Sequence, residues 1–271
     1  MRSRILFLGT GGDEFVAGKQ YRSTGGIIFN YDENQFHIDP GPSSLLMAKM
    51  ANVNLRETGA ILVTSNNLFT ANDLNAVISS MTHHGFDKRG VLICPSTVVI
   101  DENRKKNPFL NKKYKNYLER TITIDNTNKL AVNDIDIEII ELKEQKSENV
   151  GYKFITPKFN LAYIPNTTSI LNIETQLSDI DILILNITEP KDSQKSGVLN
   201  SNDAQNIINR VKPQLAIITG FGIKMIQADP LYEAREIQKN TSIQIIAAKD
   251  GMSINPISFA ATTRQKHLSK F

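Results

Sequence analysis

Phe36-His37-Ile38-Asp39-Pro40-Gly41-Pro42 carries the chain from a short strand, through a tight turn, toward a helix. An aspartate before Pro-Gly-Pro is a strong turn signal. At the end of a strand, its carboxylate projects toward the sheet edge where α/β proteins usually place their sites. Asp39 is therefore predicted to shape the turn and to face a site, whereas His37 is predicted to be a satisfied core histidine.

On both sides of this stretch, short apolar runs rich in Ile, Val and Leu recur along the chain. Because Gly, Pro, Asn or Asp residues bound them, they predict strands buried on both faces or nearly so. The runs are Ile5–Leu8, Gly26–Asn30, Phe36–Ile38, Ala60–Thr64, Gly90–Cys94, Ile135–Ile140, Leu161–Ile164, Ile180–Leu185, Leu215–Thr219 and Ile243–Ala248.

Segments with helical periodicity lie between several of these runs. Asp73 and Asp203 fall in first helical turns, where capping and the helix dipole account for them. The alternation predicts an α/β fold with outer helices and a single domain over residues 1–271. Residues 101–128 are predicted to be a surface excursion with a short helix at Pro108–Leu118. The four main helical segments are Pro42–Met50, Asn72–Met81, Ser201–Val211 and Pro230–Gln238.

Gly9-Thr10-Gly11-Gly12 follows the first predicted strand and invites comparison with a phosphate-binding loop. A dinucleotide fingerprint or a P-loop would need a different glycine spacing or a Gly-Lys-Ser/Thr ending. Asp13 and Glu14 follow instead, so the sequence favours a tight turn that needs the backbone freedom of glycine.

Composition limits the classes of partner. The net charge of +3 is far weaker than that of a dedicated nucleic-acid binder, although Arg104, Lys105, Lys106, Lys112, Lys113 and Lys115 form a basic segment. Cys94 is the only cysteine and lies in an apolar run, which predicts a buried structural thiol. No stretch approaches the roughly 18 apolar residues of a membrane span. We expect a cytoplasmic protein that does not bind nucleic acid.

Motifs spread along the chain resemble those of the metallo-β-lactamase superfamily, particularly its ribonuclease Z and cyclic-phosphate phosphodiesterase branch. No single motif is specific, but their order and spacing together are. The resemblance implies an αββα sandwich of two mixed sheets with outer helices. It rests on Ile5–Gly12, His37–Pro42, Ala60–Thr64, Val150–Tyr152, Tyr163–Thr167, Leu183–Thr188, Lys212–Gly222 and Ala247–Met252.

The resemblance also assigns the metal-binding positions of this family to residues of the present chain. Its H-x-H-x-D-H motif falls on Ser65, Asn67, Phe69 and Thr70, and its bridging aspartate falls on Asn166. Its remaining histidines fall within Gln145-Lys146-Ser147 and on Val198 and Gly220. In the family, the aspartate matching Asp39 supports the site without binding the metals.

These substitutions predict that no metal site remains. Amide and hydroxyl oxygens are poor zinc ligands, and Phe69, Val198 and Gly220 offer no donor. A two-metal centre needs several imidazoles and a bridging carboxylate, whereas Asn166 carries no charge. None of the four histidines, His37, His83, His84 and His267, has the spacing of a zinc motif. We therefore expect no cofactor, with weakly bound zinc as the alternative.

The sequence thus predicts a non-catalytic protein that keeps the fold for binding, assembly or regulation. A polar pocket of Asp39, Ser65, Asn67, Thr70 and Asn166 would hold a small polar or phosphate-containing ligand. A homodimer or a complex with an active paralogue is the other kind of partnership expected. The alternative is a hydrolase or phosphodiesterase with an atypical site, in which Asp39 and His83 or His84 would serve as general acid and base.

Overall fold

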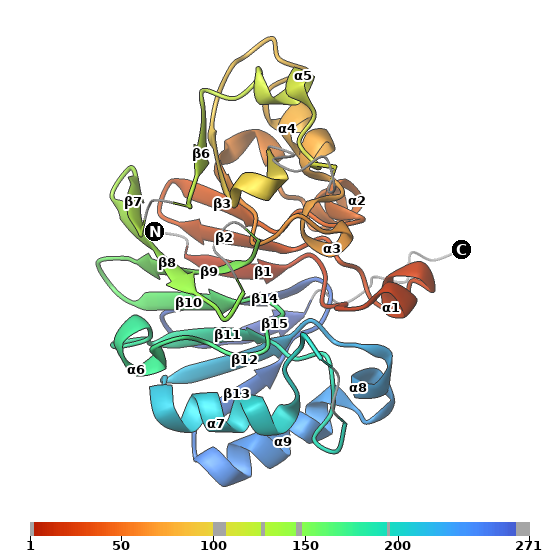
Figure 1. The fold of residues 1–271 in the computed structure, drawn as a ribbon, viewed down its shortest axis with the longest axis vertical. Coiled ribbons are helices and arrows are strands. Elements are labelled where there is room, and N and C mark those ends of the chain that lie inside the picture. Colours follow the sequence, from red (N-terminus) through yellow and green to blue (C-terminus); the bar gives the residue numbers. More distant parts are fainter. Residues whose placement is uncertain (1–2, 100–106, 126–127, 145–147, 194–195, 264–271) are drawn as a thin grey trace.

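The computed structural model describes residues 3–99, 107–125, 128–144, 148–193 and 196–263, which build two mixed β-sheets packed face to face (Figure 1). Within these residues, the first sheet has the order β15-β14-β1-β2-β3-β4-β5-β6 and the second the order β13-β12-β11-β10-β9-β8-β7. The strands of the first sheet are β1 (Arg4–Phe7), β2 (Ile27–Tyr31), β3 (Asn34–Ile38), β4 (Thr58–Leu62), β5 (Val91–Cys94), β6 (Arg120–Thr123), β14 (Met252–Ile254) and β15 (Ala261–Thr263). Those of the second are β7 (Lys129–Val132), β8 (Ile135–Glu141), β9 (Val150–Ile155), β10 (Asn160–Ile164), β11 (Ile182–Asn186), β12 (Leu215–Thr219) and β13 (Gln244–Ala247).

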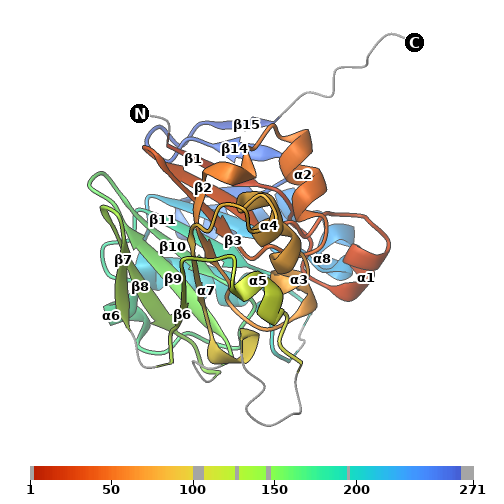
Figure 2. The ribbon, with the colours of Figure 1, turned by 90° about the horizontal axis from the view of Figure 1, so that it is seen from above.

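Helices cover the outer faces of both sheets, which confirms the expected αββα sandwich. Figure 2 shows α2 and α4 lying over the first sheet, and Figure 1 shows α7 and α9 below the second. The helices are α1 (Glu14–Gly18), α2 (Ser44–Met50), α3 (Leu68–Ala71), α4 (Leu74–Met81), α5 (Lys112–Lys115), α6 (Ile173–Gln176), α7 (Ser201–Val211), α8 (Ile223–Gln227) and α9 (Pro230–Thr241), with short 3₁₀ turns at Leu55–Glu57 and Ser96–Val98. No helix in the described part of the chain is long and apolar enough to cross a membrane.

The main core lies between the two sheets. Its centre is an aromatic cluster in which Phe29 and Phe154 meet edge to face at 5.2 Å, with Phe36 and Phe159 beside them. Further apolar clusters join each sheet to its own helices. Strand β12, which pairs with β11 on one side and β13 on the other, is buried at every residue, as expected of a parallel strand covered on both faces.

Within the predicted surface excursion at 101–128, the described residues 107–125 contribute more to the fold than a surface excursion would. Residues 120–123 form β6, which pairs in parallel with β5, and Leu110, Leu118 and Ile124 are buried. The predicted helix Pro108–Leu118 shrinks to Lys112–Lys115. Polar residues separate these apolar residues in the sequence, so no regular strand pattern of apolar residues predicted β6. Of the basic segment, residues 104–106 lie outside the described residues.

The turn at Gly9–Gly12 is present, but the reason for its glycines differs from the prediction. None of these glycines has a positive φ angle. A Cβ on Gly12 would instead lie 1.9 Å from the carbonyl oxygen of Gly220, and one on Gly9 would lie 2.4 Å from that of Ser23. These glycines are required because other backbone segments pass directly against them.

The two helix-start aspartates behave differently. Asp203 completes a capping box with Asn200 at the start of α7, as the sequence predicts. Asp73 precedes α4, but its side chain does not cap that helix. Its Oδ2 accepts a hydrogen bond of 2.9 Å from the backbone N–H of Ser44, so it links α4 to the start of α2.

Candidate functional site

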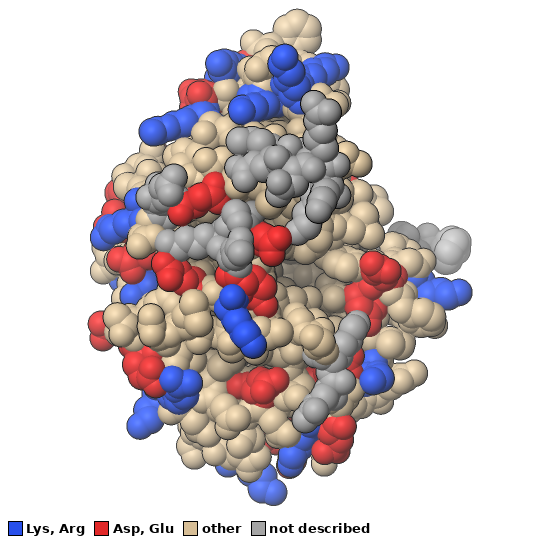
Figure 3. Space-filling view, in the orientation of Figure 1, with Lys and Arg blue, Asp and Glu red and all other residues tan. Residues whose placement is uncertain are grey.

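A cleft of about 760 Å³ opens where the loops after several strands of both sheets converge. It lies at the sheet edge to which Asp39 was expected to point, and Figure 3 looks into a hollow on this face. The predicted pocket residues line it together with the other described positions that the resemblance assigned to metal ligands. These lining residues are Asp39, Ser65, Asn67, Phe69, Thr70, Asn166, Val198 and Gly220.

The loop from Ser65 to Thr70 satisfies its own polar groups. Asn67 caps the short helix α3, since its Oδ1 accepts hydrogen bonds from the N–H groups of Phe69 and Thr70 at 2.9 and 3.2 Å. Its Nδ2 donates to the hydroxyl of Ser65 at 2.7 Å, and the hydroxyl of Thr70 donates to the Ser65 carbonyl. The side chains at these positions therefore hold the loop in shape.

Asp39 lies at the floor of the cleft, in the left-handed region at φ 51°. It is 3% exposed, and its carboxylate accepts hydrogen bonds from the N–H and hydroxyl of Thr64 and the hydroxyl of Tyr163, at 2.8 to 3.0 Å. Burial raises the pKa of Asp39 to about 7 and outweighs these hydrogen bonds, which lower it. The group therefore changes charge near neutral pH.

His37, on β3 and two residues before Asp39, is a buried core histidine as predicted, but it is not fully satisfied, because its Nδ1 has no hydrogen-bond partner among the described residues. It is fully buried, and its Nε2 donates to the carbonyl of Gly25 at 3.0 Å. Burial lowers the pKa of its imidazole to about 4, so the ring is neutral at physiological pH. Cys94 is also fully buried, and burial raises the pKa of its thiol.

Asn166 and Gly220, which follow β10 and β12 of the second sheet, also line the cleft. Asn166 Oδ1 accepts a hydrogen bond of 2.9 Å from the hydroxyl of Thr188. Gly220 has φ 69°, and a Cβ there would lie 2.8 to 3.0 Å from side-chain atoms of Asn186. The strained backbone and Asn186 therefore leave no room for a histidine at this position without rearrangement.

The sequence did not single out a set of acidic residues that also line the cleft. Glu144 and Glu148 come from the β8–β9 loop, and Asp13 and Glu14 from the start of α1. Asp13 also accepts hydrogen bonds from the N–H groups of Val16 and Ile223. The local sequence around Glu144 is a mixed polar run without a motif, so only the fold could bring these carboxylates together.

The side chains of the cleft do not fit a zinc centre. Among the described residues, no group of three or more His, Cys, Asp or Glu side chains is arranged to hold a metal ion. The pairing of Asp39 with His83 or His84 is wrong, because both histidines line a separate surface hollow with Arg56 and Ser79. Residues 145–147 and His267 lie outside the described part of the chain.

Comparison with known proteins places this arrangement in a family. A family model described as the beta-lactamase superfamily domain matches residues 34–221. The chain belongs to the metallo-β-lactamase superfamily. The uncharacterized protein MJ1374 of Methanocaldococcus jannaschii is 27% identical to this chain over 256 residues. The match covers 94% of this chain and 95% of the relative.

Two further similarities concern a sequence relative and a solved structure of the same fold. Ribonuclease Z of Borreliella burgdorferi is 27% identical over 158 residues, or 57% of this chain and 49% of that protein. Among solved structures, the metallo-β-lactamase fold protein YhfI of Bacillus subtilis matches with a TM-score of 0.75 at 14% identity. That match covers 93% of this chain and 98% of YhfI.

Proposed function

We propose that this protein is a non-catalytic member of the metallo-β-lactamase superfamily whose cleft binds a small polar ligand. The observation that carries the proposal is the hydrogen bonding of the 65–70 loop. Its polar side chains cap α3 and bond to one another. They therefore act as structural groups at the positions where the resemblance expects metal ligands.

The rest of the cleft supports the same proposal. Hydrolysis by two metals needs a bridging carboxylate and several imidazoles to generate a hydroxide. Here Asn166 is neutral and bonded to Thr188, and Gly220 has no side chain. The cleft itself is still open, with a volume in the range of small-molecule sites.

The proposal is tested by metal content and turnover of the purified protein. The protein would be stripped with EDTA, incubated with zinc chloride, desalted, and analysed for metal by mass spectrometry. We expect far less than one zinc per chain and no zinc-dependent hydrolysis of bis(p-nitrophenyl) phosphate. Near-stoichiometric zinc together with EDTA-sensitive turnover would instead establish the atypical hydrolase.

A pair of variants shows where any bound zinc resides. Asp39→Asn removes the carboxylate at the cleft floor, and Asp136→Asn removes one on β8 that does not line the cleft. Zinc held adventitiously at the surface would be retained by Asp39→Asn. Zinc lost from Asp39→Asn but kept by Asp136→Asn would place a metal site in the cleft and overturn the proposal.

A further inference from the structure

We propose that the ligand of this cleft is a small molecule that carries a protonated amine on an apolar or aromatic body. This inference rests on the proposed function and names the class of ligand. Its basis is the combination of acidic walls, an exposed apolar rim and an unpartnered acceptor around one concave site.

The described residues that line the cleft include five carboxylate side chains and no lysine, arginine or histidine. Figure 3 shows acidic side chains on either side of the hollow. Lys143 is exposed next to Glu144 in the chain but is not among the lining residues. A potential of one sign inside a low-dielectric cleft concentrates ligands of the opposite sign.

Glu144 provides a fixed negative charge on one wall. Its Oε2 accepts a hydrogen bond of 2.6 Å from the hydroxyl of Thr167, and its Oε1 accepts two of 3.2 Å from Thr168. Partial burial raises the pKa of Glu144, but these hydrogen bonds outweigh it, so the pKa lies below its usual range. The carboxylate is therefore ionised and held in one orientation.

The rim of the cleft presents apolar surface that the protein does not bury. Phe15 is 51% exposed and Leu68 is 42% exposed, and both line the cleft. Phe15 lies beside Glu14 and packs against Tyr21 at 6.1 Å between ring centroids. Exposed apolar side chains around a concave site favour a ligand with an apolar body, and an aromatic face also attracts a cation.

Asn149, which also lines the cleft, carries an acceptor that lacks a donor among the described residues. The Nδ2 group of Asn149 donates to the carbonyl of Asn166 at 2.8 Å, which fixes the orientation of the amide. Its Oδ1 is buried and has no hydrogen-bond partner among the described residues. Since buried acceptors are normally satisfied, an N–H donor from a ligand would complete this wall.

The same features disfavour a phosphate ligand. Phosphate sites use arginine, lysine or convergent backbone N–H groups, whereas here the described lining is acidic. A phosphate dianion would have to approach the ionised carboxylate of Glu144 in a partly enclosed cleft, where repulsion is weakly screened. The charges of the described lining residues therefore favour a small polar ligand with a positive charge over the phosphate-containing ligand that the sequence also allowed.

Three probes of similar shape test the inference by isothermal titration calorimetry. They are 2-phenylethylamine, which is cationic, 2-phenylethanol, which is neutral, and phenyl phosphate, which is anionic. We expect saturable binding of the amine, and affinity for the alcohol weaker by about tenfold, the loss of one charged hydrogen bond. Tighter binding of phenyl phosphate, or no saturable binding of the amine, would overturn the inference.

Matched variants localise the effect. Glu144→Gln should weaken amine binding by about tenfold, while Glu33→Gln, at an exposed glutamate in the β2–β3 turn, should leave it unchanged. Equal affinities of the two variants would contradict the role of Glu144. If Glu144→Gln fails to fold, the wild-type protein still tests the inference. Its affinity for the amine should fall when the salt concentration is raised from 50 to about 500 mM. A salt-independent affinity would contradict the inference.

Failure here is distinct from failure of the proposed function. Binding of phenyl phosphate without turnover would overturn the amine ligand and leave a non-catalytic binding protein. Zinc-dependent turnover would overturn the non-catalytic role, whichever probe binds.

Discussion

Asp39 shows how one residue carries both structure and site. Its left-handed backbone starts the Asp-Pro-Gly-Pro turn, a conformation that aspartate tolerates better than most residues. Its carboxylate is buried on the cleft floor and accepts hydrogen bonds from Thr64 and Tyr163. No ion pair to a described residue offsets the charge, which makes this side chain sensitive to pH.

Asp39 and His37 should affect stability in opposite directions as the pH changes. The pKa of Asp39 rises from 3.8 to about 7 on folding, so its contribution is fully present below pH 3.8 and is lost as the pH rises through 7. The pKa of His37 falls from 6.5 to about 4, so its contribution is fully present above pH 6.5 and is lost as the pH falls through 4. Between these limits the two effects largely cancel.

Single variants should uncover each effect in urea unfolding measured from pH 4 to 8. Relative to the wild type, Asp39→Asn should gain free energy of unfolding as the pH rises from 4 to 7. His37→Gln, which keeps a donor for Gly25, should gain as the pH falls from 6.5 to 4. Each difference should exceed about 1 kcal/mol, since one pKa unit corresponds to about 1.4 kcal/mol. Difference curves that stay flat with pH would contradict the assignment.

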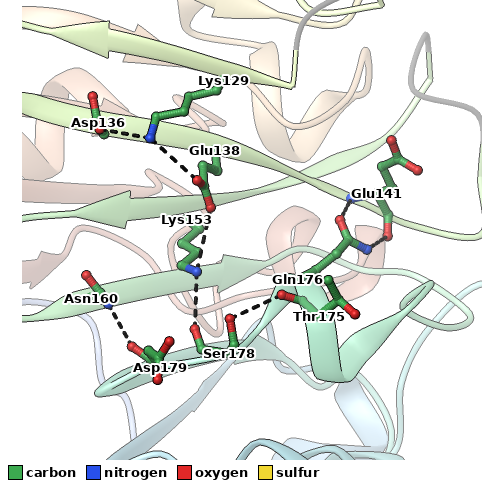
Figure 4. Close-up of polar contacts among 10 residues, drawn as sticks. All are labelled: Lys129, Asp136, Glu138, Glu141, Lys153, Asn160, Thr175, Gln176, Ser178 and Asp179. Carbon is green, nitrogen blue, oxygen red and sulfur yellow. Dashed lines mark hydrogen bonds and ion pairs between the residues drawn. The ribbon is translucent and has the colours of Figure 1, made fainter.

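At the scale of elements, β8 shows how an alternating strand is used on both faces. Ile135, Ile137 and Ile139 face the core, while Asp136 and Glu138 face outward. Lys129 on β7 and Lys153 on β9 lie opposite Glu138 in register and form ion pairs with this strand at 3.0 to 3.7 Å (Figure 4). The pairs of Lys129 are largely exposed, so they specify register more than they add stability, whereas the side chain of Lys153 is nearly buried.

Gln176 provides the contact that holds α6 at the end of β8. Its Oε1 accepts from the N–H of Glu141 at 2.6 Å, and its Nε2 donates to the Glu141 carbonyl at 3.0 Å (Figure 4). Gln176→Ala should lower the free energy of unfolding by about 1–2 kcal/mol, because the N–H of Glu141 loses the acceptor that Gln176 provides, whereas the Glu141 carbonyl keeps the N–H of Leu171. Thr175→Ala, at an exposed neighbour on the same helix, should change it by less than about 0.5 kcal/mol. Urea denaturation measures both, and equal effects would argue against this role of Gln176.

At the scale of the whole molecule, two tyrosines join the sheets on the cleft side of the core. Tyr163 on β10 donates to Asp39 after β3, and Tyr152 on β9 donates to the carbonyl of Val63 after β4 at 2.7 Å. Both hydroxyls therefore cross from the second sheet to the first. The cleft lies between loops of both sheets, so its shape depends on these cross-links.

Tyr152→Phe should destabilise the sandwich by about 1–2 kcal/mol, because the buried Val63 carbonyl loses its tyrosine donor. Tyr31→Phe is the matched control, since Tyr31 is buried in the same core and no hydrogen bond of its hydroxyl to a described residue is observed. Thermal and urea unfolding would compare them. A larger loss in Tyr31→Phe would show that the sheets are not held by this contact.

The sequence predicted the fold well where patterns were local. The buried strands and the helices α7 and α9 follow from apolar runs and capping residues such as Asn200 and Asp203. It failed for β6, where polar residues separate the apolar anchors, and for the Gly9–Gly12 turn, where contact with Gly220 replaces a positive φ angle.

The candidate site divides in the same way. Asp39 and the 65–70 loop meet in one cleft, and each directly follows a predicted strand. Glu144 and Glu148 were missed because nothing near them in the chain marks a ligand site, and Asp13 was missed because the glycine turn before it favoured a structural role. The pairing of Asp39 with His83 or His84 was wrong, since sequence order does not fix which loops meet.

By itself, the sequence determined the superfamily, the strand framework and the chemical character of the cleft positions, because these depend on residue identity and local pattern. Only the tertiary structure decided how Asp39 is satisfied, why Gly12 and Gly220 must be glycines, and which charges surround the cleft. These features arise where the loops of two sheets meet. Their energies depend on distances between segments more than 100 residues apart, such as the Tyr163–Asp39 contact.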